Sequence, residues 1–129
     1  MTVPAGGPRD KRGRVTRSRD FDAVYRRGRS TAGRHMVVYA FRREDPDPGP
    51  ARLGLSVSRK VGGSVERNRV KRVLREQFAA HAASVPQGHD VVVIARSGLA
   101  AYLAEQGSDV VGARLGEMLA KLFAAEASA

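Results

Sequence analysis

Hydrophobic residues recur along this chain in two spacings, one typical of helices and one typical of strands. Phe21, Val24 and Tyr25 stand at i, i+3 and i+4, and they predict a short helix over about residues 18–27. Gly28 follows at a position where helices commonly end. The first ordered element is therefore expected to be an amphipathic helix.

Two β-rich segments follow this helix. Residues 35–43 alternate two sets of apolar side chains, which predicts a strand that is covered on both faces. Residues 52–58 read as a second strand with apolar residues on one face and Gly54, Ser56 and Ser58 on the other. The proline-rich stretch between them favours a hairpin with a long turn. The small-residue face would leave room for a ligand to lie on the sheet.

The second half of the chain predicts two more helices and one more strand. A core stripe at i, i+4 and i+8 begins at Val70 and predicts a helix from about residue 64 to residue 83. Residues 90–95 are almost entirely apolar, as in a central strand with both faces covered. A last amphipathic helix is expected over about residues 109–125. The fold class is therefore α+β, with a sheet of about four strands.

Length and composition limit the possibilities further. The chain has 129 residues, which suits one domain with a modest core. It has no cysteine, and this excludes a disulfide framework and a thiolate metal site. No apolar run reaches the roughly 18 residues of a membrane-spanning helix, and the N-terminus lacks the apolar core of a signal peptide. We therefore expect a cytoplasmic protein.

Charge points to the class of partner. The net charge is +10, and residues 1–75 carry 20 basic and 7 acidic residues, whereas residues 76–129 carry 3 basic and 6 acidic residues. A concentrated positive field attracts a polyanion. An acidic membrane surface is the weaker alternative, because the basic residues are spread over several elements and do not follow one amphipathic helix. The split therefore favours nucleic-acid binding.

The basic residues concentrate on the helix predicted after the second strand. Arg67, Lys71 and Arg75 stand at i, i+4 and i+8, with Asn68 and Arg72 in the adjacent row. Like charges at this spacing destabilise a helix by roughly 0.2–0.5 kcal/mol per pair. An ordinary solvated face interleaves glutamate with lysine, and this run has almost no acidic partner. The pattern therefore indicates a polyanionic ligand.

Two stretches resemble the signature of the bacterial ribonuclease P protein component. Residues 54–62 read GLSVSRKVG, and residues 67–76 read RNRVKRVLRE, which are similar to the strand end and the basic helix of that family. Residues 20–25 and 90–96 match its first helix and last strand in the expected order. The resemblance covers residues 12–124, and agreement is poorest at the two ends.

The resemblance implies a single α-β-β-β-α-β-α domain like the second domain of a small-subunit ribosomal protein. Its four-stranded sheet would be mostly antiparallel, with a left-handed β-α-β crossover and a further short strand near residues 29–32. Residues 1–14 are rich in proline, glycine and arginine without periodicity, and they are expected to be a disordered basic arm. Residues 15–125 would be the RNA-binding domain, and residues 126–129 a tail.

The resemblance also implies a function. Ribonuclease P is a ribonucleoprotein endoribonuclease that removes the 5′ leader from precursor tRNA and so produces the mature 5′ end. Its catalytic RNA subunit performs the hydrolysis with magnesium, which the RNA mainly binds, and the protein supplies no catalytic residue and no metal ligand set. The partners implied are the RNA subunit and precursor tRNA, with no membrane and no obligate protein partner. His35, His81 and His89 are consistent with this, since they form no metal-ligand spacing.

The site residues follow from the resemblance position by position. The basic helix and the preceding strand end would bind the RNA subunit or lie near the leader, and the sequence leaves open which residue does which. The sheet face and the first helix would form a cleft for the single-stranded leader. The helix residues are Arg67, Asn68, Arg69, Lys71, Arg72 and Arg75, the strand-end residues are Arg59 and Lys60, and the cleft residues are Phe21, Tyr25, Tyr39, Ser56 and Ser58.

Two other functions stay open at this point. A non-enzymic RNA-binding module of related fold would show the same charge, and only the order of the motifs argues against it. A protein-only nuclease would need a cluster of catalytic carboxylates or histidines, and the sequence shows none. The identity of the bound RNA and the activity of the purified protein separate these alternatives.

Overall fold

The computed structural model describes residues 14–15, 18–44 and 49–127. Residues 1–13 of the expected arm and residues 128–129 of the expected tail lie outside the described part. The elements in chain order are α1 (Ser18–Arg27), β1 (Arg29–Ala32), β2 (Met36–Arg42), β3 (Arg52–Ser56), α2 (Ser64–Ala80), the 3-10 turn η1 (Ala82–Ser84), β4 (His89–Ala95), α3 (Leu99–Gln106) and α4 (Ser108–Ala127).

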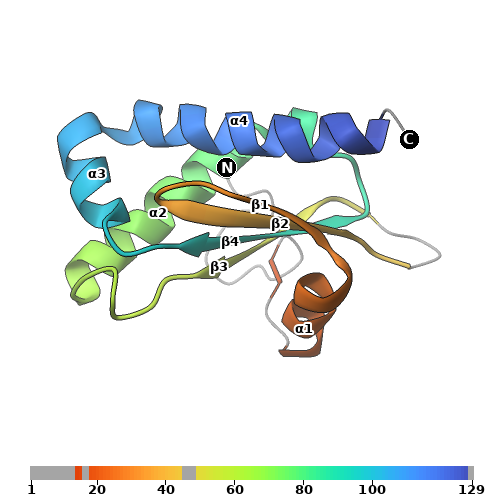
Figure 1. The fold of residues 1–129 in the computed structure, drawn as a ribbon, viewed down its shortest axis with the longest axis horizontal. Helices are drawn as coiled ribbons and strands as arrows, with labels where there is room; N and C mark the ends of the chain where they lie inside the picture. The colour runs from red at the N-terminus through yellow and green to blue at the C-terminus, as the bar shows by residue number, and fades with distance from the viewer. Residues whose placement is uncertain (1–13, 16–17, 45–48, 128–129) are drawn as a thin grey trace.

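The four strands form one mixed sheet in the order β1-β2-β4-β3 (Figure 1). The β1–β2 and β2–β4 pairs are antiparallel, and the β3–β4 pair is parallel. The α+β class, the mostly antiparallel sheet and the short strand at residues 29–32 are thereby confirmed. The helix α2 connects the parallel neighbours β3 and β4, so the β-α-β crossover is present. Its left-handed sense stays a prediction.

The prediction that residues 35–43 and 52–58 pair as a hairpin is wrong. The strand β4 lies between β2 and β3, and β2 forms its hairpin with β1 instead. The physical reason is the composition of β4, where Val91, Val92 and Val93 are all fully buried. A strand that is apolar on both faces is most stable at the centre of a sheet, and β3 with its glycine and serine takes the edge.

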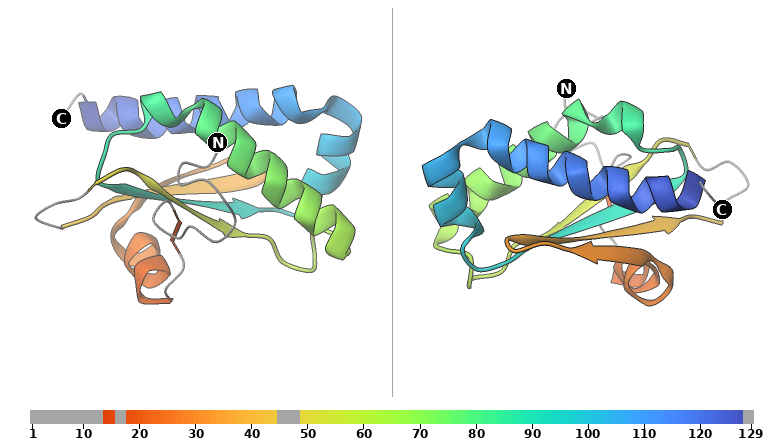
Figure 2. Two further views of the ribbon diagram at one scale, coloured as in Figure 1. Left: turned by 180° about the vertical axis from the view of Figure 1, so that it is seen from behind. Right: turned by 45° about the horizontal axis from the view of Figure 1, so that its top comes forward.

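One face of the sheet carries the main core. Met36, Val38 and Ala40 of β2 share this face with Val91 and Val93 of β4. The helices α2 and α4 cover it from the same side, as the two views of Figure 2 show. The side chains that α2 contributes are those of the predicted stripe and its neighbour, namely Val70, Val73, Leu74 and Phe78.

The opposite face is covered by α1 (Figure 1). Gly28 allows the chain to turn sharply from α1 into the sheet, because a Cβ atom there would lie 2.5 Å from the carbonyl oxygen of Val24 and 2.7 Å from that of Ala40. Val24 of α1 is fully buried. The short helix is therefore held tightly against β2 and leaves the rest of this face less covered.

The C-terminal region differs from the expectation by one element. The structure has α4 near the expected place and also α3, which the sequence analysis missed. Leu99 and Leu103 of α3 are buried at i, i+4, but the helix is short and rich in alanine, so its periodicity is weak. Gly107 separates the two helices with φ at 89°, a value that favours glycine. Within the described residues, no helix combines the length and apolar character needed to cross a membrane.

Candidate RNA interface

The basic residues of α2 divide into two rows with different surroundings. Arg67, Lys71 and Arg75 are half-buried along one flank of the helix, and we call them the basic row. The other predicted residues of the helix, Asn68, Arg69 and Arg72, are exposed. Glu66, in the first turn, uses its carboxylate to accept a hydrogen bond of 2.8 Å from the backbone N–H of Gly63.

The N-terminal segment brings a further cation to the basic row. Arg14 pairs with Leu53 at the outer edge of β3, and the next residue donates a backbone hydrogen bond of 3.0 Å to the Leu53 carbonyl. Burial lowers the pKa of Arg75, and the positive charge of Arg14 lowers the pKa further. Arg14 was not expected on this surface, because its neighbours show no periodicity that would predict pairing with a strand.

Arg67 has the most informative environment in the basic row. Its Nε atom is buried and has no hydrogen-bond partner among the described residues. A buried unpaired donor on a charged group is costly, and a phosphate oxygen would satisfy it. The basic row therefore has the properties of a surface that is completed by a polyanion.

The predicted strand-end residues lie in the turn between β3 and α2. Arg59 and Lys60 are both exposed. The turn is fixed by Val61, which is buried and donates a backbone hydrogen bond of 3.0 Å to the Ser58 carbonyl. The Ser58 hydroxyl also accepts a bond of 3.3 Å from the Lys60 backbone N–H. These two cations therefore extend the positive surface past the N-terminal end of α2.

The three predicted cleft aromatics come together on the other face of the sheet. The ring centroids of Tyr25 and Tyr39 are 5.1 Å apart in an edge-on arrangement, and those of Phe21 and Tyr25 are 6.2 Å apart. Tyr25 is 40 % exposed. Burial raises the pKa of Tyr25, with Tyr39 and Asp22 contributing in the same direction. These residues form what we call the aromatic cluster, with Tyr25 a neutral hydroxyl donor at neutral pH.

The expected open space at Gly54 is filled by the protein itself. A Cβ atom on Gly54 would lie 2.9 Å from the Val15 side chain and 3.0 Å from the Phe21 ring. The expectation that Gly54 leaves room for a ligand is therefore wrong. Glycine is needed here so that α1 and the N-terminal segment can pack against β3.

The less buried part of this face lies one step further along the strands. Strand pairing places Val37, Ile94 and Ser56 side by side on the α1 face of the sheet, next to the level of Tyr39. All three are half-buried, whereas Val92 at the previous level is fully buried. Ser58 lies beyond the end of β3 and is exposed. A chain resting on this face would therefore touch the row that contains Ser56.

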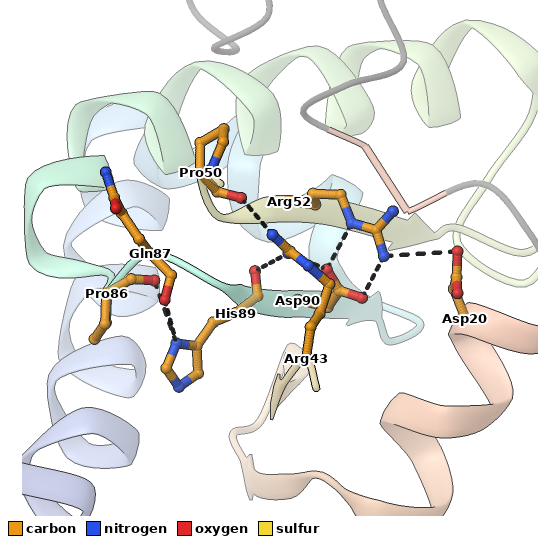
Figure 3. Close-up of polar contacts among 8 residues, drawn as sticks. All are labelled: Asp20, Arg43, Pro50, Arg52, Pro86, Gln87, His89 and Asp90. Atoms are coloured by element: carbon orange, nitrogen blue, oxygen red, sulfur yellow. Dashed lines mark hydrogen bonds and ion pairs between the residues drawn. The ribbon is translucent and has the colours of Figure 1, made fainter. Parts of the chain in front are cut away.

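A buried ionic network holds this face in place (Figure 3). The carboxylate of Asp90, on β4, is 2 % exposed and lies 2.8 Å from an Arg43 guanidinium nitrogen. Arg52 of β3 donates two hydrogen bonds to the same carboxylate, of 2.8 and 2.7 Å. The Arg52 guanidinium also lies 3.6 Å from Asp20 of α1. The network thus links α1 to the sheet. In the sequence, it is visible only as an aspartate at the start of an apolar strand.

The histidines are used in packing. The His81 ring lies 3.0 Å from the Gly112 carbonyl oxygen, between α2 and α4. The His89 ring is bonded to the Gln87 carbonyl, and His35 stacks on Tyr102. In the described part of the chain, no three histidine, aspartate or glutamate side chains are grouped so as to hold a metal ion.

Comparison with known proteins bears on this surface. The family model described as Ribonuclease P matches residues 10–121. The ribonuclease P protein component of Exiguobacterium sibiricum is 44% identical over 96 residues, covering 74% of this chain and 81% of the relative. That of Staphylococcus epidermidis is 44% identical over 87 residues, covering 67% and 73%.

Solved structures agree with these relatives. The ribonuclease P protein from Thermotoga maritima superimposes with a TM-score of 0.74 and 31% identity, covering 85% of this chain and 97% of that one. A Staphylococcus aureus ribonuclease P protein mutant, described as defective in mRNA degradation activity, gives a TM-score of 0.72 and 33% identity, covering 84% and 86%.

Proposed function

Since this chain belongs to the ribonuclease P protein family and is thus the protein component of an endoribonuclease that processes the 5′ end of tRNA, we propose a division of labour between its two surfaces. The basic row and the exposed cations of α2 bind the catalytic RNA subunit. The aromatic cluster and the half-buried sheet floor bind the single-stranded 5′ leader of precursor tRNA.

The observation that carries the first assignment is the basic row itself. It brings together cations with no acidic side chain among them, and the buried Nε of Arg67 has no hydrogen-bond partner among the described residues. Phosphate contacts from arginine and lysine give nucleic-acid complexes most of their affinity and make it dependent on salt. The pairing of β3 with Arg14 adds a cation to the same surface.

The leader assignment rests on the face opposite the main core. Single strands are commonly held by a positive groove and by aromatic rings on which bases stack. Tyr25 and Tyr39 supply two adjacent rings, and Ser56 supplies a hydroxyl on the floor beside them. The helix α1 ends in Arg26 and Arg27. Arg26 is exposed and adds positive charge at this end of the helix, whereas Arg27 pairs with Glu44.

The chemistry of cleavage is assigned to the RNA subunit. Magnesium bound mainly by the RNA would stabilise charge on the phosphate that is cleaved, and the protein would hold the two RNAs together in the cytoplasm. The protein would contribute the positive charge of α2, and its aromatic cluster would bind the leader.

Copurification tests this proposal against a ribosomal role. An affinity-tagged copy of the full chain, expressed in its native cells, is expected to bring down the ribonuclease P RNA as its predominant structured RNA. Sequencing the recovered RNA is the measurement, with a tagged unrelated basic protein as the control. Recovery of ribosomal RNA alone would contradict the proposed function.

Tyr39→Ala tests the leader assignment. The holoenzyme with this variant is expected to bind precursor tRNA about tenfold more weakly, because a stacked base contributes roughly 1–3 kcal/mol. Binding of mature tRNA, which lacks the leader, should hardly change. The measurement is the ratio of the two dissociation constants, and Tyr39→Phe, which keeps the ring, is the matched control. A parallel loss for both tRNAs would make Tyr39 a packing or assembly residue.

A further inference from the structure

A second recessed site lies on the sheet face that faces away from the aromatic cluster. It is a pocket of about 300 Å³ between the β1–β2 turn, α3 and α4. That volume falls at the lower end of the range of small-ligand sites, about 300–1,000 Å³. Its lining residues are Gly33, Arg34, His35, Met36, Tyr102, Arg114, Glu117 and Met118.

Two stacked rings belong to the lining of this pocket. The rings of His35 and Tyr102 are nearly parallel, at 18°, with their centroids 4.1 Å apart. Burial lowers the pKa of His35, and the charges of Arg34 and Arg114 lower it further. A neutral imidazole offers one donor and one acceptor to a ligand. The half-buried Met118 adds polarisable apolar surface, which adapts to a flat ring.

Two arginines lie beside the His35–Tyr102 stack. Arg34 and Arg114 are both exposed. Interaction with Tyr102 raises the pKa of Arg114, with Glu117 acting in the same direction, and the Arg114 guanidinium lies 3.4 Å from the Glu117 carboxylate. The Glu117 carboxylate can accept hydrogen bonds from an exocyclic amino group. A flat heterocycle attached to a phosphate would therefore find a matching group in each part of the pocket.

We propose that this pocket receives an unpaired nucleotide of the RNA subunit, with the base against the Tyr102–His35 stack and the phosphate beside Arg34. The assignment rests on the proposed function, because the RNA subunit is the polyanion that α2 brings to this protein. It adds a second anchoring point, built by the β1–β2 turn, α3 and α4, to the contact made by the basic row.

Photo-crosslinking locates the contact. The chain has no cysteine, so Arg34→Cys in the full-length protein carries a photoactivatable label at one position only. Assembly with the RNA subunit and irradiation should crosslink this label to a discrete unpaired nucleotide. The control is Ser84→Cys, at an exposed position beyond the C-terminal end of α2, which should not label the same nucleotide. Labelling at position 34 no stronger than at position 84 would overturn the proposal.

Affinity for the RNA subunit gives a second readout. Tyr102→Ala should weaken binding about tenfold, which corresponds to about 1.4 kcal/mol, whereas Tyr102→Phe should stay within about twofold of wild type. Since Tyr102 also packs against the core, circular dichroism must show a folded variant. Should Tyr102→Ala unfold, Arg34→Glu provides the test at an exposed position, with at least a fivefold loss expected.

The outcomes separate the two proposals. If the wild-type protein does not bind the RNA subunit, the proposed function fails together with the pocket. If wild type binds and the folded pocket variants bind equally well, only the pocket assignment fails. If adenosine monophosphate blocks crosslinking at position 34 while the variants keep full RNA affinity, the pocket takes a free nucleotide and the RNA assignment is wrong.

Discussion

Asp90→Asn is expected to lower the free energy of unfolding by about 3–5 kcal/mol, the usual cost of removing one partner from a buried ion pair. The carboxylate is almost fully buried, and it accepts hydrogen bonds from both Arg43 and Arg52. The Arg43 side chain is itself only 8 % exposed. An asparagine would keep the shape of the side chain but remove the buried negative charge that both guanidinium groups contact, with the half-buried Asp20 still 3.6 Å from Arg52.

Urea unfolding followed by circular dichroism measures this loss. Glu44→Gln is the matched control, since it removes the carboxylate of the Arg27–Glu44 pair, whose side chains are 61% and 79% exposed. Exposed pairs of this kind contribute about 0–1 kcal/mol. Equal losses in the two variants would show that the Asp90 network does not carry the stability assigned to it.

Removing the basic row is expected to have the largest effect on RNA binding. The triple variant Arg67→Ala, Lys71→Ala, Arg75→Ala should bind the RNA subunit roughly 10²–10³-fold more weakly at about 0.1 M salt, from a slope of about 0.7–0.9 per phosphate contact. The slope of log affinity against log salt should fall by about two to three units. The fold should survive, since the core stripe of α2 is untouched.

A matched triple variant separates position from total charge. The control residues are exposed and lie on α1, β2 and α4, namely Arg26, Arg42 and Lys121. Replacing them by alanine lowers the net charge of +10 by the same amount, three units. Affinity and salt slope for the RNA subunit should change much less in this control. Equal losses in both variants would mean that α2 acts only through the overall field.

Local patterns predicted the elements well where one face of an element is clearly apolar. The spacing of Phe21, Val24 and Tyr25 predicted α1, and the stripe that begins at Val70 predicted α2. Strand order is a different matter, because it depends on which strand most needs both faces covered. The apolar composition of β4 places it at the centre of the sheet. The segment between β2 and β3 therefore does not form the hairpin that their sequences alone predict.

Of the candidate site, only the parts that lie within a single helix or strand could be predicted from the sequence. The spacing of Arg67, Lys71 and Arg75 is visible on one helix, and the structure brings the three predicted aromatics of the cleft together. The filling of the Gly54 space depends on a contact between β3 and residues far from it in sequence. The same holds for Arg14 and for the Asp90 network, whose partners come from separate segments.

Reconstitution of leader removal tests the central claim most directly. Purified protein, shown to be free of RNA, and the ribonuclease P RNA subunit are each incubated with precursor tRNA at low magnesium, separately and together. We expect no cleavage by the protein alone, and efficient cleavage at the mature 5′ end when the two are combined. Cleavage by RNA-free protein, or no gain over the RNA subunit alone, would contradict the account.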